Sequence, residues 1–161
     1  MGQSLNSKGL QALNAICPYY TMFPLHFPMR VLKGRVDADD WVLDPFCGRG
    51  TTNFAARLLG VRSVGIDTSR VAVALTQAKL ADAAAQEVVG AATAILRTQS
   101  RVTNPRGEFW RRAVHPNVLN ALCHLRRALL ESCQSDARIL LRAIILGALH
   151  GPRTKQERSC R

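Results

Sequence analysis

The sequence predicts an α/β fold in which a parallel βαβα unit is followed by a helical segment. Two short apolar runs, residues 41–43 and 63–66, each end at an acidic residue, and each precedes apolar side chains at helical spacing. No other run has the length and composition of a buried strand, whereas open α/β sheets commonly have about five or six strands. We therefore expect an incomplete sheet.

The first predicted strand leads into a glycine-rich turn and then into a helix. Thr51 or Thr52 is expected to cap this helix, because a threonine hydroxyl can accept a hydrogen bond from the free backbone N–H groups of the first turn. Apolar residues then recur at helical spacing until Gly60 ends the helix. This order of strand, turn and helix is the first half of the βαβα unit.

The second predicted strand is followed by Thr68 or Ser69, either of which can cap the next helix. An alanine-rich face continues that helix, and we expect it to include residues 80–85. A right-handed crossover joins parallel strands, so both strand ends, and the acids that follow them, come to one edge of the sheet.

Composition divides the chain into four segments. Residues 1–40 are rich in proline and aromatic side chains, and we expect an extended or turn-rich segment that packs near the ligand site. Residues 41–97 hold the βαβα unit, residues 98–150 form the helical segment, and residues 151–161 are expected to be a disordered polar tail.

The helical segment opens with a polar stretch, residues 98–107, that predicts an exposed loop. Helices are predicted to begin near Pro116 and near Ser135, which can serve as a cap. In the second helix, residues 139–149 are apolar on nearly every side, so we expect this helix to be buried. The expected apolar face of the first helix consists of Val118, Leu122, Leu125 and Leu129.

The formal charge of +11 is concentrated in the second part of the chain. Residues 1–96 carry nine basic and seven acidic side chains, and residues 97–161 carry thirteen and four. A polyanionic partner such as DNA would explain this excess, because basic side chains release counterions from phosphates. The competing interpretation is that the many arginines form solvated helix faces.

The remaining sequence features argue against a membrane-spanning protein, a secreted protein and a metal site. The longest apolar run, Ala143–Leu149, has seven residues, whereas a membrane span needs roughly 20. The N-terminus lacks a signal-peptide pattern, and the five cysteines and four histidines have no metal-ligand spacing. We expect a cytoplasmic protein with reduced thiols and no metal.

The most informative stretch is residues 44–52 (DPFCGRGTT). Gly48 and Gly50 permit unusual backbone conformations and let a ligand approach the main chain. Asp67, at the end of the next strand, can accept hydrogen bonds from two ribose hydroxyls. Asn53 replaces the third glycine of a dinucleotide motif, which disfavours a dinucleotide. The pattern predicts a nucleoside-containing cofactor over the strand ends.

Residues 43–60 (LDPFCGRGTTNFAARLLG), followed by SVGID, resemble the cofactor-binding motif of S-adenosylmethionine-dependent DNA methyltransferases that modify adenine N-6 or cytosine N-4. The upstream PYYTMFPLHFP resembles the F-x-FP segment of the same family. The resemblance covers roughly residues 18–80 and extends more loosely into the following helices. It implies a partial Rossmann-like methyltransferase sheet, S-adenosylmethionine as cofactor, DNA as partner, and a restriction-modification setting.

By this resemblance, the turn and the strand ends hold the cofactor. Phe46, Gly48 and Gly50 would line its methionine and adenosine moieties. Asp44 would lie near its amino group, and Asp67 would hold the ribose.

The resemblance also assigns residues on either side of the turn. Thr21, Phe23 and Pro24 would close the methionine end of the cofactor site. Pro45 and Thr51 complete the set of expected cofactor-binding residues.

One departure from the family concerns catalysis. Amino methyltransferases carry (D/N/S)-P-P-(Y/F/W), which holds the target amine and stacks on the extruded base. The sequence has no Pro-Pro pair, and its nearest approach, Pro18-Tyr19-Tyr20, follows Cys17. Positioning supplies most of the rate for so poor a nucleophile. We therefore expect no catalytic residue and no methyl transfer by this chain alone.

Three functional hypotheses remain open. The first is the N-terminal portion of a DNA amino methyltransferase, truncated before its catalytic motif, with the remaining part encoded downstream or separately. The second is a non-catalytic module that binds the cofactor or nucleic acid and assists a partner. The third is a fragment of an RNA amino methyltransferase, since guanine N-2 enzymes use a similar turn. The Thr51-Thr52 pair and the FPLHFP segment favour DNA.

Overall fold

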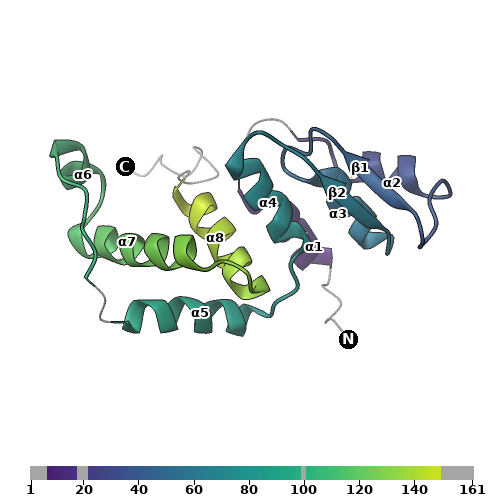
Figure 1. The fold of residues 1–161 in the computed structure, drawn as a ribbon. Helices are drawn as coiled ribbons and strands as arrows, with labels where there is room; N and C mark the ends of the chain where they lie inside the picture. Colours follow the sequence, from purple (N-terminus) through teal and green to yellow (C-terminus); the bar gives the residue numbers. More distant parts are fainter. Residues whose placement is uncertain (1–6, 18–21, 99–100, 150–161) are drawn as a thin grey trace, which may run out of the picture. The chain divides into compact units, whose positions relative to one another are not determined.

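A computed structural model describes residues 7–17, 22–98 and 101–149 of the chain (Figure 1). The described residues belong to two compact units, divided as Met1–Asp82 with Ala143–Arg161, and Ala83–Arg142. The expected disordered tail lies outside the described residues. Within them, no helix is long and apolar enough to cross a membrane.

The first unit is built on two parallel strands, as the sequence predicts. β1 (Trp41–Asp44) pairs with β2 (Arg62–Gly65), with Trp41 opposite Arg62 and Asp44 opposite Gly65. α3 (Thr51–Leu58) connects the strands and contacts both of them. The α/β class and the small, open parallel sheet are therefore confirmed.

The core of this unit lies between the sheet and α3. Val42 points from β1 toward α3 and packs with Ala56 and Val61, all of them buried. Partly buried side chains from the chain before β1 and after α3 surround this cluster: Leu32, Val36 and Leu59. One face of the sheet is therefore covered by helix.

The segment before β1 is more helical than expected. It contains α1 (Ser7–Asn14) and α2 (His26–Leu32), and α2 contacts α3. The expectation of a turn-rich segment is wrong here because Pro28 occupies the third position of α2. An N–H in the first helical turn has no intrahelical partner, so its absence in proline costs nothing there.

α4 (Arg70–Leu80) begins as predicted, with Ser69 Oγ accepting a hydrogen bond from the N–H of Ala72 at 3.4 Å. The expected continuation through residues 80–85 is wrong. Arg57 donates from Nη1 to the carbonyls of Lys79 at 2.7 Å and Ala81 at 2.8 Å. These bonds satisfy carbonyl groups that the last helical turn leaves free, so the chain can leave the helix there.

The second unit is helical. α5 (Ala85–Arg97) contacts α7 (Pro116–Glu131), and α6 (Glu108–Ala113) precedes α7. α6 was not predicted, because its six residues (EFWRRA) are too few to show a helical spacing of apolar side chains. The polar stretch before it is without regular structure at residues 101–106, in agreement with the predicted loop.

The predicted helix starts in this region are confirmed. α7 begins at Pro116, and α8 (Asp136–Leu149) follows Ser135, whose Oγ accepts a hydrogen bond from the N–H of Arg138 at 3.4 Å. The predicted burial is only partly right. Leu125 and Leu129 of α7 are buried, but Val118 is exposed and its neighbour Leu119 takes its place.

Residues 139–149 of α8 were predicted to be buried, and this prediction is also only partly right. Leu140, Leu141 and Ala143 are buried, whereas Ile144 and Leu149 are exposed. The C-terminal part of α8 belongs to the first unit, where Gly147 lies against the carbonyl of Ile16.

Candidate functional site

The glycine turn after β1 is tied to the end of β2. Asp44 Oδ1 accepts a hydrogen bond from the N–H of Phe46 at 3.2 Å, which bends the chain directly after the strand. The N–H of Ile66 donates to the carbonyl of Asp44, and the N–H of Cys47 donates to the carbonyl of Ile66, both at 2.9 Å. The turn is thus an ordered extension of the sheet.

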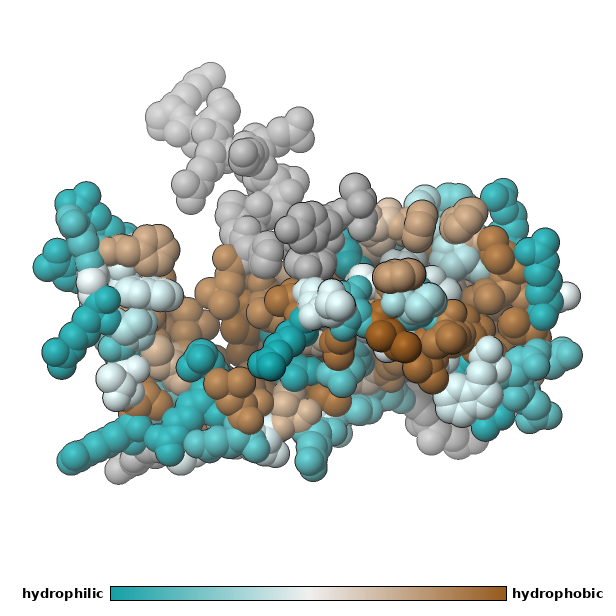
Figure 2. All heavy atoms as spheres, turned by 45° about the horizontal axis from the view of Figure 1, so that its top comes forward, coloured by the Kyte–Doolittle hydropathy of each residue, from teal (hydrophilic) through white to brown (hydrophobic). Residues whose placement is uncertain are grey.

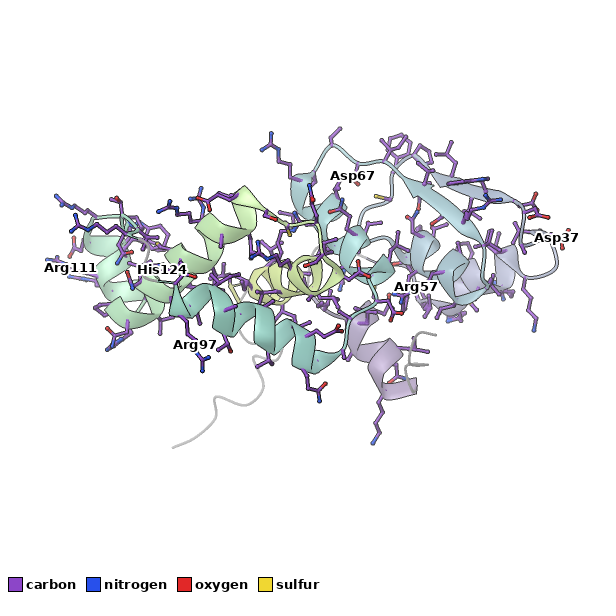
Figure 3. All side chains as sticks on the ribbon, turned by 60° about the horizontal axis from the view of Figure 1, so that its bottom comes forward. Asp37, Arg57, Asp67, Arg97, Arg111 and His124 are labelled. Carbon is purple, nitrogen blue, oxygen red and sulfur yellow. The ribbon has the colours of Figure 1, made fainter. Side chains whose placement is uncertain are left out.

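The Asp67 carboxylate lies against this turn. Its Oδ2 accepts a hydrogen bond from the N–H of Gly48 at 2.9 Å, and its Oδ1 accepts one from the N–H of Ser69 at 2.8 Å. Figure 3 places Asp67 and Asp37 at opposite ends of the two strands. The expected proximity of Asp67 to the glycine turn, at the carboxyl edge of the sheet, is therefore confirmed.

The two glycines of the turn differ in what surrounds them. Both have positive φ, 50° at Gly48 and 67° at Gly50. A Cβ on Gly50 would lie 2.6 Å from Thr76 Oγ1 and 2.8 Å from the Cα of Thr76. A Cβ on Gly48 would meet only the carbonyl oxygen of Phe46, at 4.0 Å. The approach to the main chain that the sequence predicted for both glycines is therefore open at Gly48, while α4 fills the space at Gly50.

Thr76 of α4 contacts the buried side of the glycine turn. Its Oγ1 lies 3.3 Å from the carbonyl of Gly48 and 3.4 Å from the Sγ of Cys47, both within hydrogen-bond distance. Burial raises the pKa of the Cys47 thiol, and the charges of Asp67 and Asp44 raise it further. A buried thiol with a raised pKa is a poor nucleophile, and Cys47 packs against α4 beneath the turn.

Asn53, at the position of the missing third glycine, anchors α3 to β2. It is fully buried and donates from Nδ2 to the Oγ of Ser63 at 3.1 Å. A Cβ on Gly65 would come within 2.9 Å of Asn53 Oδ1, so the glycine in β2 leaves room for the asparagine. Asn53, which stands where a dinucleotide motif has its third glycine, is thus accommodated by Gly65 of β2.

The start of α3 differs from the prediction. The N-cap is Gly50, with no side-chain cap, and Thr51 is the first helical residue and is buried. The predicted threonine cap is wrong because the left-handed conformation needed to turn the chain into the helix falls at Gly50.

The other predicted residues occupy the outer side of the turn or the upstream segment. Phe46 is 87% exposed, and Asp44 is half-buried. Thr21 lies outside the described residues. The remaining predicted residues are exposed: Phe23, Pro24 and Pro45.

Phe23 and Pro24 follow Met22, which the structure places beside α4. Lys79 Nζ donates to Met22 Sδ at 3.9 Å. The Phe23 ring lies 5.5 Å from the Phe27 ring. The upstream segment thus reaches α4, the helix that lies under the glycine turn.

Sequence reasoning missed Lys79. Its side chain is fully buried, and its Nζ donates to Asn14 Oδ1 at 2.9 Å. Burial, and then the charge of Arg49, lower the pKa of Lys79 from 10.5 to about 7. The sequence holds no signal for this burial, because Lys79 stands in an alanine-rich helix where a lysine is normally solvated.

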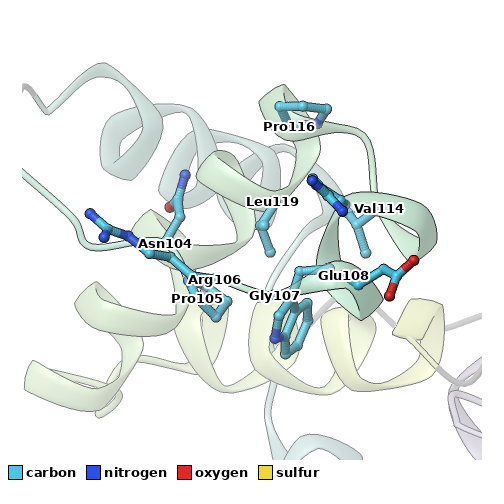
Figure 4. A pocket seen from close by; sticks show the side chains of 10 residues that line it. Asn104, Pro105, Arg106, Gly107, Glu108, Val114, Pro116 and Leu119 are labelled. Carbon is cyan, nitrogen blue, oxygen red and sulfur yellow. The ribbon is translucent and has the colours of Figure 1, made fainter.

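The second unit contains a cavity of its own. Its volume is about 430 Å³, and it lies between the loop before α6, α6 itself and the start of α7 (Figure 4). Trp110, Arg106 and Arg111 contribute to its wall. Among the described residues, no group of three acidic, cysteine or histidine side chains could hold a metal ion.

Comparison with known proteins finds a similarity in the part of the chain that holds the sheet and the glycine turn. Residues 3–78 match the family model described as DNA methylase. This segment of the chain is therefore similar to DNA methylases. The matched range contains both strands of the parallel sheet, the glycine turn and Asp67.

Two type II methyltransferases are similar in sequence to part of the chain. Over 60 residues the chain is 33% identical to M2.DpnII of Streptococcus pneumoniae and 32% identical to M2.LlaDCHI of Lactococcus lactis subsp. cremoris. Each match covers 37% of this chain and 22% of the relative. The chain therefore spans about a fifth of the length of these relatives, and no solved structure matches it.

Proposed function

We propose that the first unit binds S-adenosylmethionine as the cofactor-binding part of a DNA amino methyltransferase acting on adenine N-6 or cytosine N-4. The observation that carries this proposal is the hydrogen bond between the Asp67 carboxylate and the N–H of Gly48. It joins the acid after β2 to the glycine turn after β1 at the carboxyl edge of a parallel sheet. Ligands of open α/β sheets bind at this edge.

The residues at this edge fit such a cofactor. Each oxygen of the Asp67 carboxylate accepts one backbone N–H, which leaves a lone pair on each for a ribose hydroxyl. Gly48 presents main chain with open space above it, and Phe46 presents an exposed ring that can stack on a base. Asp44 supplies a second acid to the same edge.

In this proposal the chain binds and orients the cofactor but does not complete the reaction. S-adenosylmethionine supplies an electrophilic methyl group. Its transfer requires a group that turns the lone pair of the target amine toward that methyl, and family members use the (D/N/S)-P-P-(Y/F/W) motif for this. The 161 residues contain no Pro-Pro pair. The orienting group is therefore supplied by another polypeptide segment.

In this proposal the basic second unit contacts the DNA. Residues 83–142 hold nine arginines and four acidic side chains, a net charge of +5. Exposed arginines such as Arg111 and Arg126 can contact phosphates without reading the base sequence. The resulting association should be independent of DNA sequence and should weaken steeply with added salt.

Isothermal titration calorimetry with S-adenosylmethionine tests the cofactor assignment. Asp67→Ala should weaken the affinity about tenfold or more, since a hydrogen bond to a charged group contributes about 1.5–3 kcal/mol. Asp39→Asn is the matched control, because Asp39 is exposed and precedes β1 at the opposite end of the strands. No measurable binding by the unaltered chain, or equal affinity in both variants, would reject the assignment.

A tritiated-methyl assay on mixed-sequence DNA tests whether the chain can transfer the methyl group by itself. The purified chain should incorporate no detectable label, because it lacks the segment that orients the amine. Robust incorporation by the chain alone would show that its own residues perform the transfer.

A further inference from the structure

The second unit has a cavity that the proposed function does not use. It lies between the loop before α6, α6 and the start of α7 (Figure 4), and its volume of about 430 Å³ is that of a small-ligand site. All the residues that line it belong to the second unit, and they lie outside residues 3–78, the range that matches DNA methylases. The similarity to that family therefore assigns no role to the cavity.

The loop that forms one wall of the cavity is fixed to α7 at two points. Arg127 Nη1 donates to the carbonyl of Arg101 at 2.7 Å, and Asn104 Nδ2 donates to Asn120 Oδ1 at 3.4 Å. α7 itself contributes the buried Leu119 to the lining. The cavity is therefore built between segments that hydrogen bonds hold together within one compact unit.

An aromatic ring forms another part of the wall. Trp110 of α6 lines the cavity and is 36% exposed. The Phe109 ring lies edge-on to the Trp110 ring, with the two centroids 5.2 Å apart. An indole offers a flat apolar face on which another planar ring can stack. A base inside a duplex is already stacked and paired, so a base that stacks on Trp110 has to come from an unpaired strand.

Positive charge lies beside this aromatic wall. Arg106 and Arg111 line the cavity, and neither forms an ion pair with an acid in the part of the chain that the structure describes. The acid in the lining, Glu108, pairs with Arg112 at 2.6 Å. Figure 2 shows hydrophilic side chains beside hydrophobic ones at the end of the second unit that holds α6, at the left of the view. Aromatic rings next to cations are the combination that binds unpaired nucleotides.

Asn104 adds a polar atom that lacks a partner. Its Oδ1 is buried and accepts no hydrogen bond from the described residues, and its side chain lines the cavity. Buried polar atoms are rarely left in this state, because lost hydration costs free energy. Each DNA base carries an N–H donor on its Watson–Crick edge, and this edge is free in an unpaired strand. A base in the cavity would therefore supply the missing donor.

We propose that this cavity binds one nucleotide of an unpaired DNA strand, with the base against Trp110 and a neighbouring phosphate against Arg106 and Arg111. The proposal rests on the proposed contact of the second unit with DNA and adds to it a preference for single strands. An apolar small molecule would use Trp110 and Leu119 but would leave both arginines and Asn104 Oδ1 without partners. Stacking and an N–H donor are common to all four bases, so the site does not select one of them.

Tryptophan fluorescence tests the contact with a base directly. The chain has two tryptophans, so in Trp41→Phe the tryptophan emission comes from Trp110 alone. We expect a single strand of mixed-sequence DNA to quench this emission. A duplex of the same sequence, and free deoxynucleotides, should quench it far less.

Fluorescence anisotropy with labelled DNA tests the same contact through affinity. Trp110→Ala should weaken binding of the single strand about tenfold and leave binding of the duplex unchanged, because only an unpaired base can stack on the ring. Trp110→Phe keeps a ring and should retain most of the affinity. Trp41→Ala is the matched control, since it removes an exposed tryptophan from the first unit and should change neither affinity. Circular dichroism of each variant confirms that the chain remains folded.

A second pair of variants tests the arginines of the cavity. Arg106→Gln should weaken binding of the single strand about threefold more than binding of the duplex, because it removes a phosphate contact that only the bound strand makes. Arg97→Gln removes the same charge from an exposed position on α5, and it should weaken the two alike.

Three results would overturn the proposal. They are the absence of quenching by the single strand, equal losses of affinity in Trp110→Ala and Trp41→Ala, and stronger quenching by RNA than by DNA of the same sequence, which would assign the cavity to RNA. The duplex separates this proposal from the general contact with phosphates. Salt-dependent duplex binding without a preference for single strands rejects only the cavity, and single-strand binding without duplex binding rejects only the general contact.

Discussion

The two sides of the glycine turn have different roles although they alternate along one short stretch of chain. The inner side is buried between α4 and the sheet, and comprises Cys47, Gly50, Asn53 and, on α4, Thr76. The outer side is at least partly open to solvent: Asp44, Phe46, Gly48 and Asp67. The difference teaches that a glycine-rich motif combines packing requirements with ligand requirements, and that only the neighbours of each glycine distinguish them.

The largest expected effect comes from the inner side. Gly50→Val places a branched side chain against the backbone of Thr76, where a single Cβ would already come within 2.8 Å of Cα. The position also requires positive φ, which is strained for a β-branched residue. We expect the free energy of unfolding to fall by about 3 kcal/mol or more. Denaturant titration followed by circular dichroism measures this change.

Gly90→Val provides the comparison for that variant. Gly90 lies in α5, and an added Cβ there meets nothing within 4 Å. Its effect should remain within about 0.5 kcal/mol, because glycine and valine differ little in a helix. Equal destabilisation by the two variants would contradict the tight packing at Gly50.

A second effect, dependent on pH, comes from Lys79, one turn beyond Thr76 on α4. Its pKa is about 7 in the folded chain and 10.5 in its ordinary state. Between these values the unfolded chain binds more protons than the folded chain, so the free energy of unfolding rises with pH. Below pH 7 the lysine is charged in both states and the full cost of burying the charge is present.

Lys79→Met removes this pH dependence. From pH 7 to 9, the stability of the unaltered chain should gain on that of the variant by up to about 1.4 kcal/mol per pH unit. Thermal or denaturant unfolding at matched pH values measures the difference. Parallel pH profiles for the two proteins would show that Lys79 titrates at its ordinary pKa when folded.

The outer side should respond in ligand binding and not in stability. Gly48→Asn adds a side chain that tolerates positive φ, so the fold should be nearly unaffected. The amide would project into the open space above the turn, and the affinity for S-adenosylmethionine should fall about tenfold in calorimetry. Lost stability with unchanged affinity would assign Gly48 to the inner side.

The sequence could predict the parts of the fold that depend on local pattern. Two apolar runs that end in acids, a glycine turn and a serine cap are local features, and β1, β2 and the start of α4 lie where they indicate. The break after Leu80 was missed because it depends on Arg57, which is more than 20 residues away in sequence. A helix end stabilised by a distant guanidinium leaves no trace in an alanine-rich stretch.

The candidate site shows the same limit. The proximity of Asp67 to the turn follows from strand order and crossover handedness, so the sequence could predict it. The difference between Gly48 and Gly50 depends on where Thr76 lies, which no spacing rule provides. Lys79 and Asn53 were likewise invisible as buried groups, because their partners, Asn14 and Ser63, come from other elements of the fold.

The smallest expected effect concerns Phe46, the most exposed residue of the outer side. Its ring is 87% exposed, so Phe46→Ala removes almost no packing and should change the free energy of unfolding by less than about 0.5 kcal/mol. If the ring stacks on the adenine of the cofactor, the variant should bind S-adenosylmethionine about fivefold more weakly, since stacking contributes about 1 kcal/mol or more. Phe46→Tyr keeps the ring and should restore the affinity. If alanine and tyrosine variants bind equally well, the ring does not stack, and the outer side recognises the cofactor through Gly48 and Asp67 alone.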